Sequence, residues 1–353
     1  MATSEDLIRF GVVPAHGPQH LATAIEQVRQ CKAYGFDSIW IEEHHAAGPY
    51  WPTPFLAIAA LAPHLDGLMI GTDILILPLH DPVEVAEQAA VIDQLTAGRF
   101  VLGVGLGDSP VEFAAFRVPA NQRGARFEEQ LLIIRALWRG ETVSHRGRFY
   151  ELKSVRLETE PKQVGGPPIW IGGWGPLQLS RAANIGNAWF PGPVGSMTEV
   201  NELLTRYDQL VLEKGEDPLS RSRPITRDVV IASDRAEAWE LANQSVLHGY
   251  RDTYLEGDHP LVGKGSGVAF ADLQDMARDR LVIGNPQEVA AQIARCIVRL
   301  QANHVILRLK LPGVEPGDIT HMIDLLGRDV LPKLREACRN ESSLKQLAAL
   351  AVA

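Results

Sequence analysis

Short apolar segments alternate with longer helical segments along nearly the whole chain, and this alternation restricts the possible folds more than any other feature. The apolar segments are apolar on both faces, as strands of a sheet covered on both sides are. We predict strands over residues 7–13, 36–41, 68–77, 99–105, 168–172, 187–190, 225–233 and 305–309. We predict helices over residues 20–34, 55–61, 82–95, 124–139, 176–185, 197–213, 234–248, 286–300 and 319–335.

Eight strands paired with helices indicate an α/β protein with a (β/α)8 TIM barrel. We predict two insertions in it: a hairpin over 141–152, after the fourth helix, and an irregular segment over 249–266, after the seventh helix. A doubly wound open sheet is the main alternative. It is disfavoured because the glycines at 103, 105 and 107 follow the fourth strand and lack the dinucleotide-binding spacing. We expect one domain over 1–339 and a C-terminal tail over 340–353, either loose or an oligomer contact.

Composition excludes several classes of function. The net charge is -9 and no basic run occurs, which argues against a nucleic-acid partner. No apolar run is long enough to cross a bilayer, and the N-terminal residues lack a signal-peptide pattern. The three scattered cysteines fit reduced, buried thiols better than a disulfide framework. We therefore expect a cytoplasmic protein without a membrane partner.

Four ionisable residues, Glu42, Glu43, His44 and His45, directly follow the second predicted strand. In a barrel the loops after the strands build the active site. Neighbours in an extended segment point to opposite sides, so we expect only one histidine to face the pocket. We interpret His44 as a proton donor or acceptor and His45 and Glu43 as its support. The alternative is that the histidines only neutralise the carboxylates. The spacing disfavours a metal site, and we predict none.

Three further segments reach the same end of the predicted barrel. Asp73 and Ile74 interrupt the third strand, either for a ligand or because Asp73 simply reaches the mouth. The turn Gly172-Gly173-Trp174-Gly175-Pro176 is an anion site or only a tight turn, and Arg181 in the next helix adds charge there or faces solvent. The glycines up to Gly107 allow a close approach, while Asp108 or Ser109 caps a turn. We interpret His16, His80 and His145 as ordinary loop or surface histidines.

Taken together, these residues resemble the bacterial luciferase-like family of flavin-dependent monooxygenases and oxidoreductases. The resemblance covers nearly the whole chain. It rests on these motifs in order: Gly35-Phe36-Asp37-Ser38-Ile39-Trp40 running into Glu43-His44-His45; Gly71-Thr72, Leu77-Pro78 and Asp81-Pro82; Ala86-Glu87-Gln88 and Asp93-Gln94-Leu95; Gly98-Arg99-Phe100; Arg126-Phe127-Glu128-Glu129; Pro167-Pro168 running into Ile169-Trp170-Ile171-Gly172-Gly173; Ile283-Gly284-Asn285-Pro286; and Gly327 with Val330-Leu331-Pro332.

The resemblance implies a barrel that binds reduced FMN, or the deazaflavin coenzyme F-420, at the C-terminal ends of its strands. It implies a non-prolyl cis peptide at Asp73-Ile74 beside the flavin ring, and His44 at the reactive side of that ring. It also implies a phosphate near residues 172–176. FMN-binding members often carry an arginine after the fourth strand. Here that position, next to Gly105, is Leu106, which keeps the deazaflavin open.

From the resemblance we expect a monooxygenase that uses reduced FMN and oxygen on an apolar organic substrate. A separate reductase would supply the reduced FMN, since the chain has no nicotinamide fingerprint. Two alternatives remain: a deazaflavin-dependent dehydrogenase or reductase that transfers hydride, and a non-catalytic flavin-binding subunit. We also expect a homodimer, as the family forms.

Overall fold

The computed structural model describes residues 8–46, 50–250, 261–262, 270, 272–311 and 313–351. In this part of the chain the sheet strands are β1 (Arg9–Val13), β2 (Ser38–Ile41), β3 (Met69–Thr72), β4 (Leu75–Ile76), β5 (Phe100–Gly105), β8 (Ile169–Gly172), β9 (Ala188–Phe190), β10 (Pro224–Ile231), β11 (Val282–Gly284) and β12 (His304–Arg308). They pair in the order β11, β10, β12, β1, β2, β3, β5, β8, β9, with β4 beside β5, and the pairs are parallel. β9 also contacts β10, so the sheet curls strongly.

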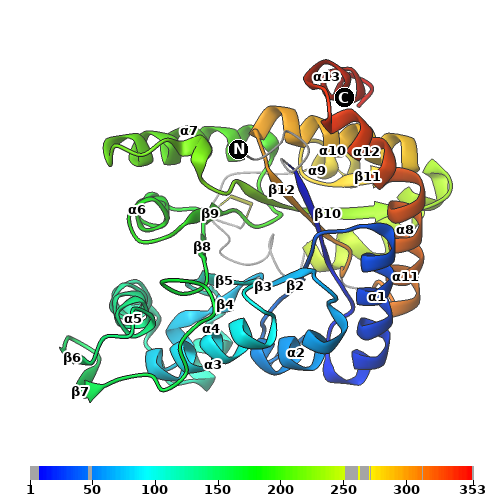
Figure 1. Cartoon of the computed structure of the whole chain (residues 1–353). Helices are drawn as coiled ribbons and strands as arrows, with labels where there is room; N and C mark the ends of the chain where they lie inside the picture. Colours follow the sequence, from blue (N-terminus) through cyan, green and yellow to red (C-terminus); the bar gives the residue numbers. More distant parts are fainter. Residues whose placement is uncertain are drawn as a thin grey trace.

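Helices surround this curled sheet (Figure 1). They are α1 (Leu21–Tyr34), α2 (Pro54–Leu61), α3 (Pro82–Leu95), α4 (Pro110–Ala115), α5 (Arg123–Trp138), α6 (Pro176–Asn184), α7 (Met197–Glu213), α8 (Arg235–Tyr250), α9 (Leu273–Ala277), α10 (Pro286–Leu300), α11 (Pro316–Leu325), α12 (Leu331–Cys338) and α13 (Glu341–Ala349). The predictions for α3, α7 and α10 are confirmed to the residue. Each of these helices has a side-chain N-cap, from Asp81, Ser196 and Asn285, which fixes where it begins.

The structure corrects several predicted elements. The third strand is broken into β3 and β4, and the predicted cis peptide between Asp73 and Ile74 is present at the break. β11, α4 and α9 were not predicted. Residues 341–349 are not a loose tail, because they form α13, which packs against α10 and α12. The predicted segment 249–266 lies almost entirely outside the described residues.

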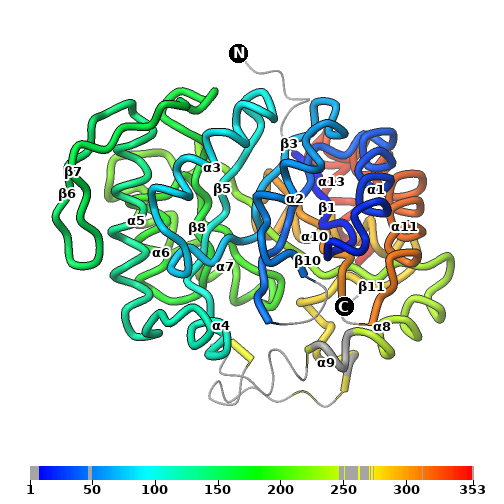
Figure 2. The backbone as a smooth tube through the Cα atoms, turned by 90° about the horizontal axis from the view of Figure 1, so that it is seen from below, coloured from blue at the N-terminus to red at the C-terminus, as the bar shows by residue number. Residues whose placement is uncertain are grey.

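A two-stranded antiparallel hairpin, β6 (Val143–Arg146) and β7 (Glu151–Val155), follows α5. It lies at the periphery of the molecule beside α5, as Figure 2 shows. The chain reverses over residues 147–150, where Gly147 N–H donates to the carbonyl of Tyr150 at 2.9 Å. The turn is therefore slightly later than His145-Arg146-Gly147, where the sequence predicts it.

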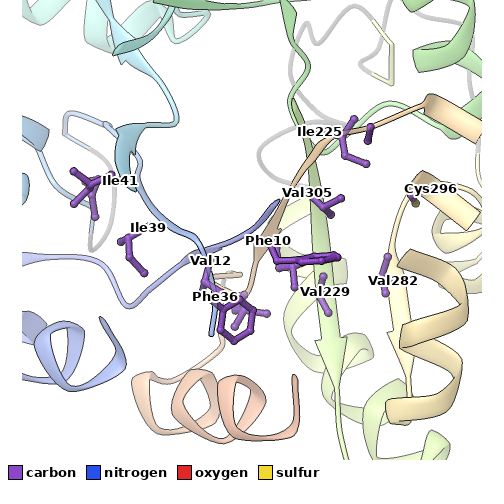
Figure 3. Packing of buried hydrophobic residues seen from close by; sticks show 14 of the residues in the cluster. Phe10, Val12, Phe36, Ile39, Ile41, Ile225, Val229, Val282, Cys296 and Val305 are labelled. Carbon is purple, nitrogen blue, oxygen red and sulfur yellow. The ribbon is translucent and has the colours of Figure 1, made fainter. Parts of the chain in front are cut away.

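Two separate hydrophobic layers hold the sheet. Trp40 and Trp170 stack 4.9 Å apart inside the curl, together with Phe190 and Ile306. Gly71 makes room for this plug, because a Cβ there would lie 2.5 Å from the Trp40 ring. Outward-facing residues of the strands, such as Phe10 and Val229, pack in the layer toward the helices (Figure 3). The plug fills one end of the interior and leaves the carboxyl ends of the strands for polar residues.

Candidate active site

The residues that follow β2 continue the alternation of the strand. Trp40 faces the interior plug, and Ile41 belongs to the outer layer. Alternation then turns Glu42 inward and Glu43 outward. The contacts agree: Glu42 Oε1 accepts a hydrogen bond from Arg308 at 3.2 Å, and Glu43 Oε2 accepts one from the backbone N–H of Ile76 at 2.5 Å. Glu42 therefore lies among the polar residues inside the curled sheet, and Glu43 lies on the outer side of its strand.

Glu43 is the anchor of a buried cluster. Its Oε1 accepts from Nε2 of His80 at 2.7 Å and from Nε2 of His45 at 3.0 Å. Burial on its own raises the pKa of Glu43, but the hydrogen bonds from His45, His80 and Ile76 outweigh it and lower the pKa to about 2. Glu43 is thus a fixed anion that orients two imidazoles. His80 lies in a loop, as interpreted, but its contact with Glu43 places it beside the proposed site.

Among the described residues, the side chains of Glu43, His45 and His80 form the group that could hold a metal ion. Their ligating atoms all lie within 4.8 Å of one another. In the structure, however, the two imidazoles hydrogen-bond to Glu43 itself. That no metal binds here stays a prediction.

His44 is the most accessible member of the segment, with 38% of its side chain exposed. Its Nδ1 lies 3.3 Å from Oε1 of Glu112, and its ring packs edge-on against Tyr50 at 4.5 Å. Burial works to lower the pKa of His44, but the hydrogen bond to Glu112 and the charges of Glu42, Glu112 and Asp108 raise it overall. His44 therefore binds a proton more tightly than an ordinary imidazole does.

Glu112 was not singled out from the sequence. It lies at the third position of α4, and Ser109 caps this helix by accepting from the backbone N–H of Glu112 at 3.4 Å. Ser109 thus caps the start of α4, which agrees with the capping role predicted for Asp108 or Ser109. The spacing of Ser109 and Glu112 is that of a capping box, which could have revealed the short helix. The Glu112 carboxylate turns to the His44-His45 segment instead, where it also accepts from the backbone N–H of His45 at 2.8 Å.

A buried ion-pair network faces the interior at the ends of β2, β10 and β12. Arg308 donates through Nε and Nη2 to Asp228, and Nη2 lies 2.9 Å from Oδ2. The same guanidinium reaches Glu42, and the hydroxyl of Tyr250 donates to Asp228 at 2.6 Å. Glu42 is thus a member of this buried network. No motif in the sequence pointed to Arg308, Asp228 or Tyr250.

Asp73 and His16 complete the interior cluster with neutral groups. Burial, followed by the charge of Glu42, raises the pKa of Asp73 to about 8, so its carboxyl is protonated at neutral pH. Burial, followed by the charge of Lys310, lowers the pKa of His16 to about 3. His16 lies in a loop, as one of its two interpretations had it, but it is 1% exposed, so it is not a surface histidine. His145, in contrast, pairs with Glu129 beside the hairpin, far along the chain from these groups.

Several buried polar atoms at this site lack a hydrogen-bond partner within the described part of the chain. They are both ring nitrogens of His16, Oε2 of Glu42 and Oε2 of Glu112. His16 Nε2 lies 3.3 Å from Glu42 Oε2, but without the angles of a hydrogen bond. Buried polar groups in folded proteins are nearly always satisfied. The set therefore leaves hydrogen-bonding capacity for a polar ligand at the carboxyl ends of the strands.

The glycine-rich turn after β8 leads into α6 as predicted. Gly173 has a φ of +120°, and α6 begins without a side-chain cap at Gly175. A Cβ on Gly175 would meet no atom within 4 Å, so the start of the helix is open. Arg181 does not point freely into this space, because Nε pairs with Glu128 at 2.7 Å. The turn suits an anion held by backbone N–H groups.

The glycines of β5 have a structural reason. A Cβ on Gly103 would lie 1.9 Å from the carbonyl oxygen of Thr72, and one on Gly105 would lie 2.7 Å from Cδ1 of Ile74. The partner that approaches is thus the chain itself, at the junction of β3 and β4. Leu106 follows as a partly buried residue packed against the outer layer.

Within the described residues, no helix is both long enough and apolar enough to cross a membrane. The family described as luciferase-like monooxygenase matches residues 6–304. Among curated relatives, 4-hydroxyprotoasukamycin monooxygenase of Streptomyces nodosus subsp. asukaensis is 30% identical over 72% of this chain and 71% of its own. The oxygenase component of flavin-dependent trigonelline monooxygenase from Acinetobacter baylyi is 28% identical over 72% and 74%. F420-dependent glucose-6-phosphate dehydrogenase of Amycolatopsis mediterranei is 25% identical over 90% and 95%.

Solved structures share the fold. Monooxygenase RslO1 from Streptomyces bottropensis superposes with a TM-score of 0.79 at 22% identity, covering 92% of this chain and 99% of its own. The oxygenating constituent of 3,6-diketocamphane monooxygenase from Pseudomonas putida, in complex with FMN, gives 0.74 at 19% identity, covering 93% and 99%.

Proposed function

The chain belongs to the luciferase-like monooxygenase family, and from that premise we propose that it is a flavin-dependent monooxygenase that takes reduced FMN and oxygen to an apolar organic substrate. The family consists of oxidoreductases, so the alternative of a non-catalytic subunit is set aside. The finer architecture we propose is a (β/α)8 barrel with the β6–β7 hairpin and the segment after α8 as insertions. Reduced flavin would supply the electrons for oxygen activation, and the protein would supply position and a dry site.

The single observation that carries the proposal is the placement of His44. Glu112 engages Nδ1 of His44, and no described residue is recorded as a partner of Nε2. Nε2 is therefore the nitrogen left to exchange a proton with a ligand at the mouth of the sheet. Glu43 acts through His45 and His80, which we propose to be positioning residues. His45 and Glu43, which the sequence grouped with His44 as its support, keep this supporting role in the proposal.

We propose that Asp73, Ile74, Gly105 and Leu106 border the flavin ring. Its phosphate would rest on the backbone of Gly172, Gly173, Trp174 and Gly175, with Arg181 contributing only if it leaves Glu128. The residues present fit an anion at this turn, since the start of α6 is open and uncapped. A separate reductase as partner is supported by the relative named as an oxygenase component. A homodimer and a cytoplasmic location stay predictions.

Leu106 favours a second candidate for the function of the protein. An apolar residue stands where FMN-binding members often place an arginine, and one relative covering 90% of the chain is named for F420. A deazaflavin-dependent dehydrogenase or reductase is therefore the alternative. In that case Nε2 of His44 would accept the hydroxyl proton of an alcohol that is oxidised, or donate a proton to the oxygen of a carbonyl that is reduced, and the bound deazaflavin would supply the chemistry of hydride exchange.

The cofactor is decided by binding under anaerobic conditions. Reduced FMN and reduced coenzyme F-420 are titrated separately into the purified protein, and binding is followed by absorbance and calorimetry. The proposal predicts tighter binding of reduced FMN. Tight binding of the deazaflavin with no affinity for FMN would replace the first proposal by the second, and binding of neither would reject both.

A further inference from the structure

A cavity lies outside the curled sheet, behind β10 and apart from the interior cluster. Its walls come from α7, α8, α10, β11 and residues 274–281, and α7 and α10 lie on the same side of the molecule (Figure 1). The lining is strongly basic, with five arginines: Arg227, Arg235, Arg278, Arg280 and Arg295. Its only acidic residues, within the described chain, are Asp279 and Glu288.

Four of these arginines have an acidic partner. Arg235 pairs with Glu288 at 2.6 Å and Arg295 with Asp279 at 2.8 Å. Arg280 pairs with Glu199 at 3.0 Å through Nη2, while Arg278 lies 3.9 Å from Asp275. Both carboxylates of the lining are therefore already engaged, and neither is left to neutralise the fifth arginine.

Arg227 is that fifth arginine, and it is 2% exposed. Its neighbours on β10, Thr226 and Asp228, contact Asp73 and Arg308 in the interior, so alternation turns Arg227 to the outer side. Nη1 donates to the carbonyl oxygens of Gly195 at 3.0 Å and of Thr226 at 3.4 Å. Nε and Nη2 have no partner among the described residues, and no described carboxylate lies within 4.0 Å of the guanidinium.

A buried guanidinium without a counter-ion is costly, and arginine does not escape the cost by losing its proton. Arg280 adds a second buried guanidinium to the same cavity, with Nε also lacking a partner within the chain as described. Two such groups beside one cavity match the oxygens of a phosphate or a carboxylate, which arginine binds through paired hydrogen bonds. The lining therefore has the chemistry of an anion-binding site.

We propose that this cavity is an oxyanion-binding site for a small molecule carrying a phosphate or carboxylate group, with Arg227 as its central ligand and Arg280 beside it. The site is separate from the turn at Gly172–Pro176, which follows β8 and opens at the start of α6. Its occupant would connect β10 with the start of α7 and with β11. The inference stands independently of the cofactor proposed above.

Thermal unfolding with added anions tests the site. Inorganic phosphate, acetate and chloride are compared at equal ionic strength, because only a specific site gives a saturable rise in melting temperature. Phosphate or acetate should stabilise the wild-type protein beyond chloride, and whichever does so identifies the class of anion. Arg227→Met should weaken that anion at least about tenfold, a loss of about 1.4 kcal/mol. Arg181→Met is the matched control at the glycine-rich turn and should leave the effect intact.

The proposal is overturned if neither anion exceeds chloride, or if the effect survives in Arg227→Met. A second measurement needs no variant and covers the case in which Arg227→Met fails to fold. Hydrogen exchange of the wild-type protein with and without the stabilising anion should show protection over residues 193–197 and 279–284. Protection confined to residues 172–178 would place the anion at the glycine-rich turn and reject the site.

Discussion

The carboxylate of Glu112 lies 3.3 Å from Nδ1 of His44, although 68 residues separate the two in the chain. The same oxygen accepts the backbone N–H of His45 at 2.8 Å. Glu112 is 1% exposed, so its charge acts on His44 with little screening by solvent. The short helix α4 thereby sets both the position and the proton affinity of the proposed catalytic histidine.

Glu112→Gln should shift the pH profile of activity toward acid. The carboxylate of Glu112 raises the pKa of His44, so its removal lets His44 lose its proton at a lower pH. The measurement is the pH dependence of reduced-flavin reoxidation in wild type and variant. Glu151→Gln, in the exposed hairpin, is the control. An unchanged profile in Glu112→Gln would show that Glu112 has only a structural role.

Glu43→Ala should destabilise the fold. The change leaves the buried N–H of Ile76 and the imidazole of His80 without their acceptor, at a cost of about 2–4 kcal/mol. Because the folded-state pKa is lowered to about 2, the contribution of Glu43 is fully present above the ordinary pKa of about 4.5 and is lost as pH falls toward 2. Urea unfolding at pH 7 and pH 4 checks both points. A variant as stable as wild type at pH 7 would contradict the assignment.

Arg308→Met should lower the free energy of unfolding more than most single substitutions would. It leaves Asp228 and Glu42 as buried carboxylates without their cation, which costs about 3–5 kcal/mol. The double variant Arg308→Met, Asp228→Asn should recover part of this loss, since one of the uncompensated charges is removed. Chemical denaturation of the two single variants and the double variant measures the coupling. Strict additivity would mean that the pair does not interact.

Stability should fall on mild acidification because of two buried histidines. His16 and His304 each have a pKa lowered to about 3 by burial, so the folded state holds them neutral while the unfolded chain takes up protons. Above pH 6.5 this difference in pKa has no effect on the free energy of unfolding. As pH falls from 6.5 toward 3, it lowers the free energy of unfolding by about 1.4 kcal/mol per pH unit for each histidine. His304→Gln should show a shallower decline than wild type between pH 6.5 and 5. The exposed-site variant His321→Gln should not.

Much of the fold could be predicted because its signals are local. Asp81 and Pro82 mark the start of α3, and the charged residues after the apolar residues of β2 drew attention to His44. The partners of these groups could not be predicted in the same way. Glu42 and Arg308 are 266 residues apart, and they meet because β2 and β12 both pair with β1. The lowered pKa of His16 likewise depends, after its burial, on the charge of Lys310, which lies near the other end of the chain.

The most direct test of the central claim is the reoxidation of bound reduced FMN after rapid mixing with air. Wild type, His44→Ala and His45→Ala are compared with free reduced FMN. We predict that wild type binds the reduced cofactor and changes its rate of reoxidation, that His44→Ala still binds but loses most of this effect, and that His45→Ala loses less. Reoxidation by His44→Ala indistinguishable from wild type, or no binding of reduced FMN by wild type, would contradict the account.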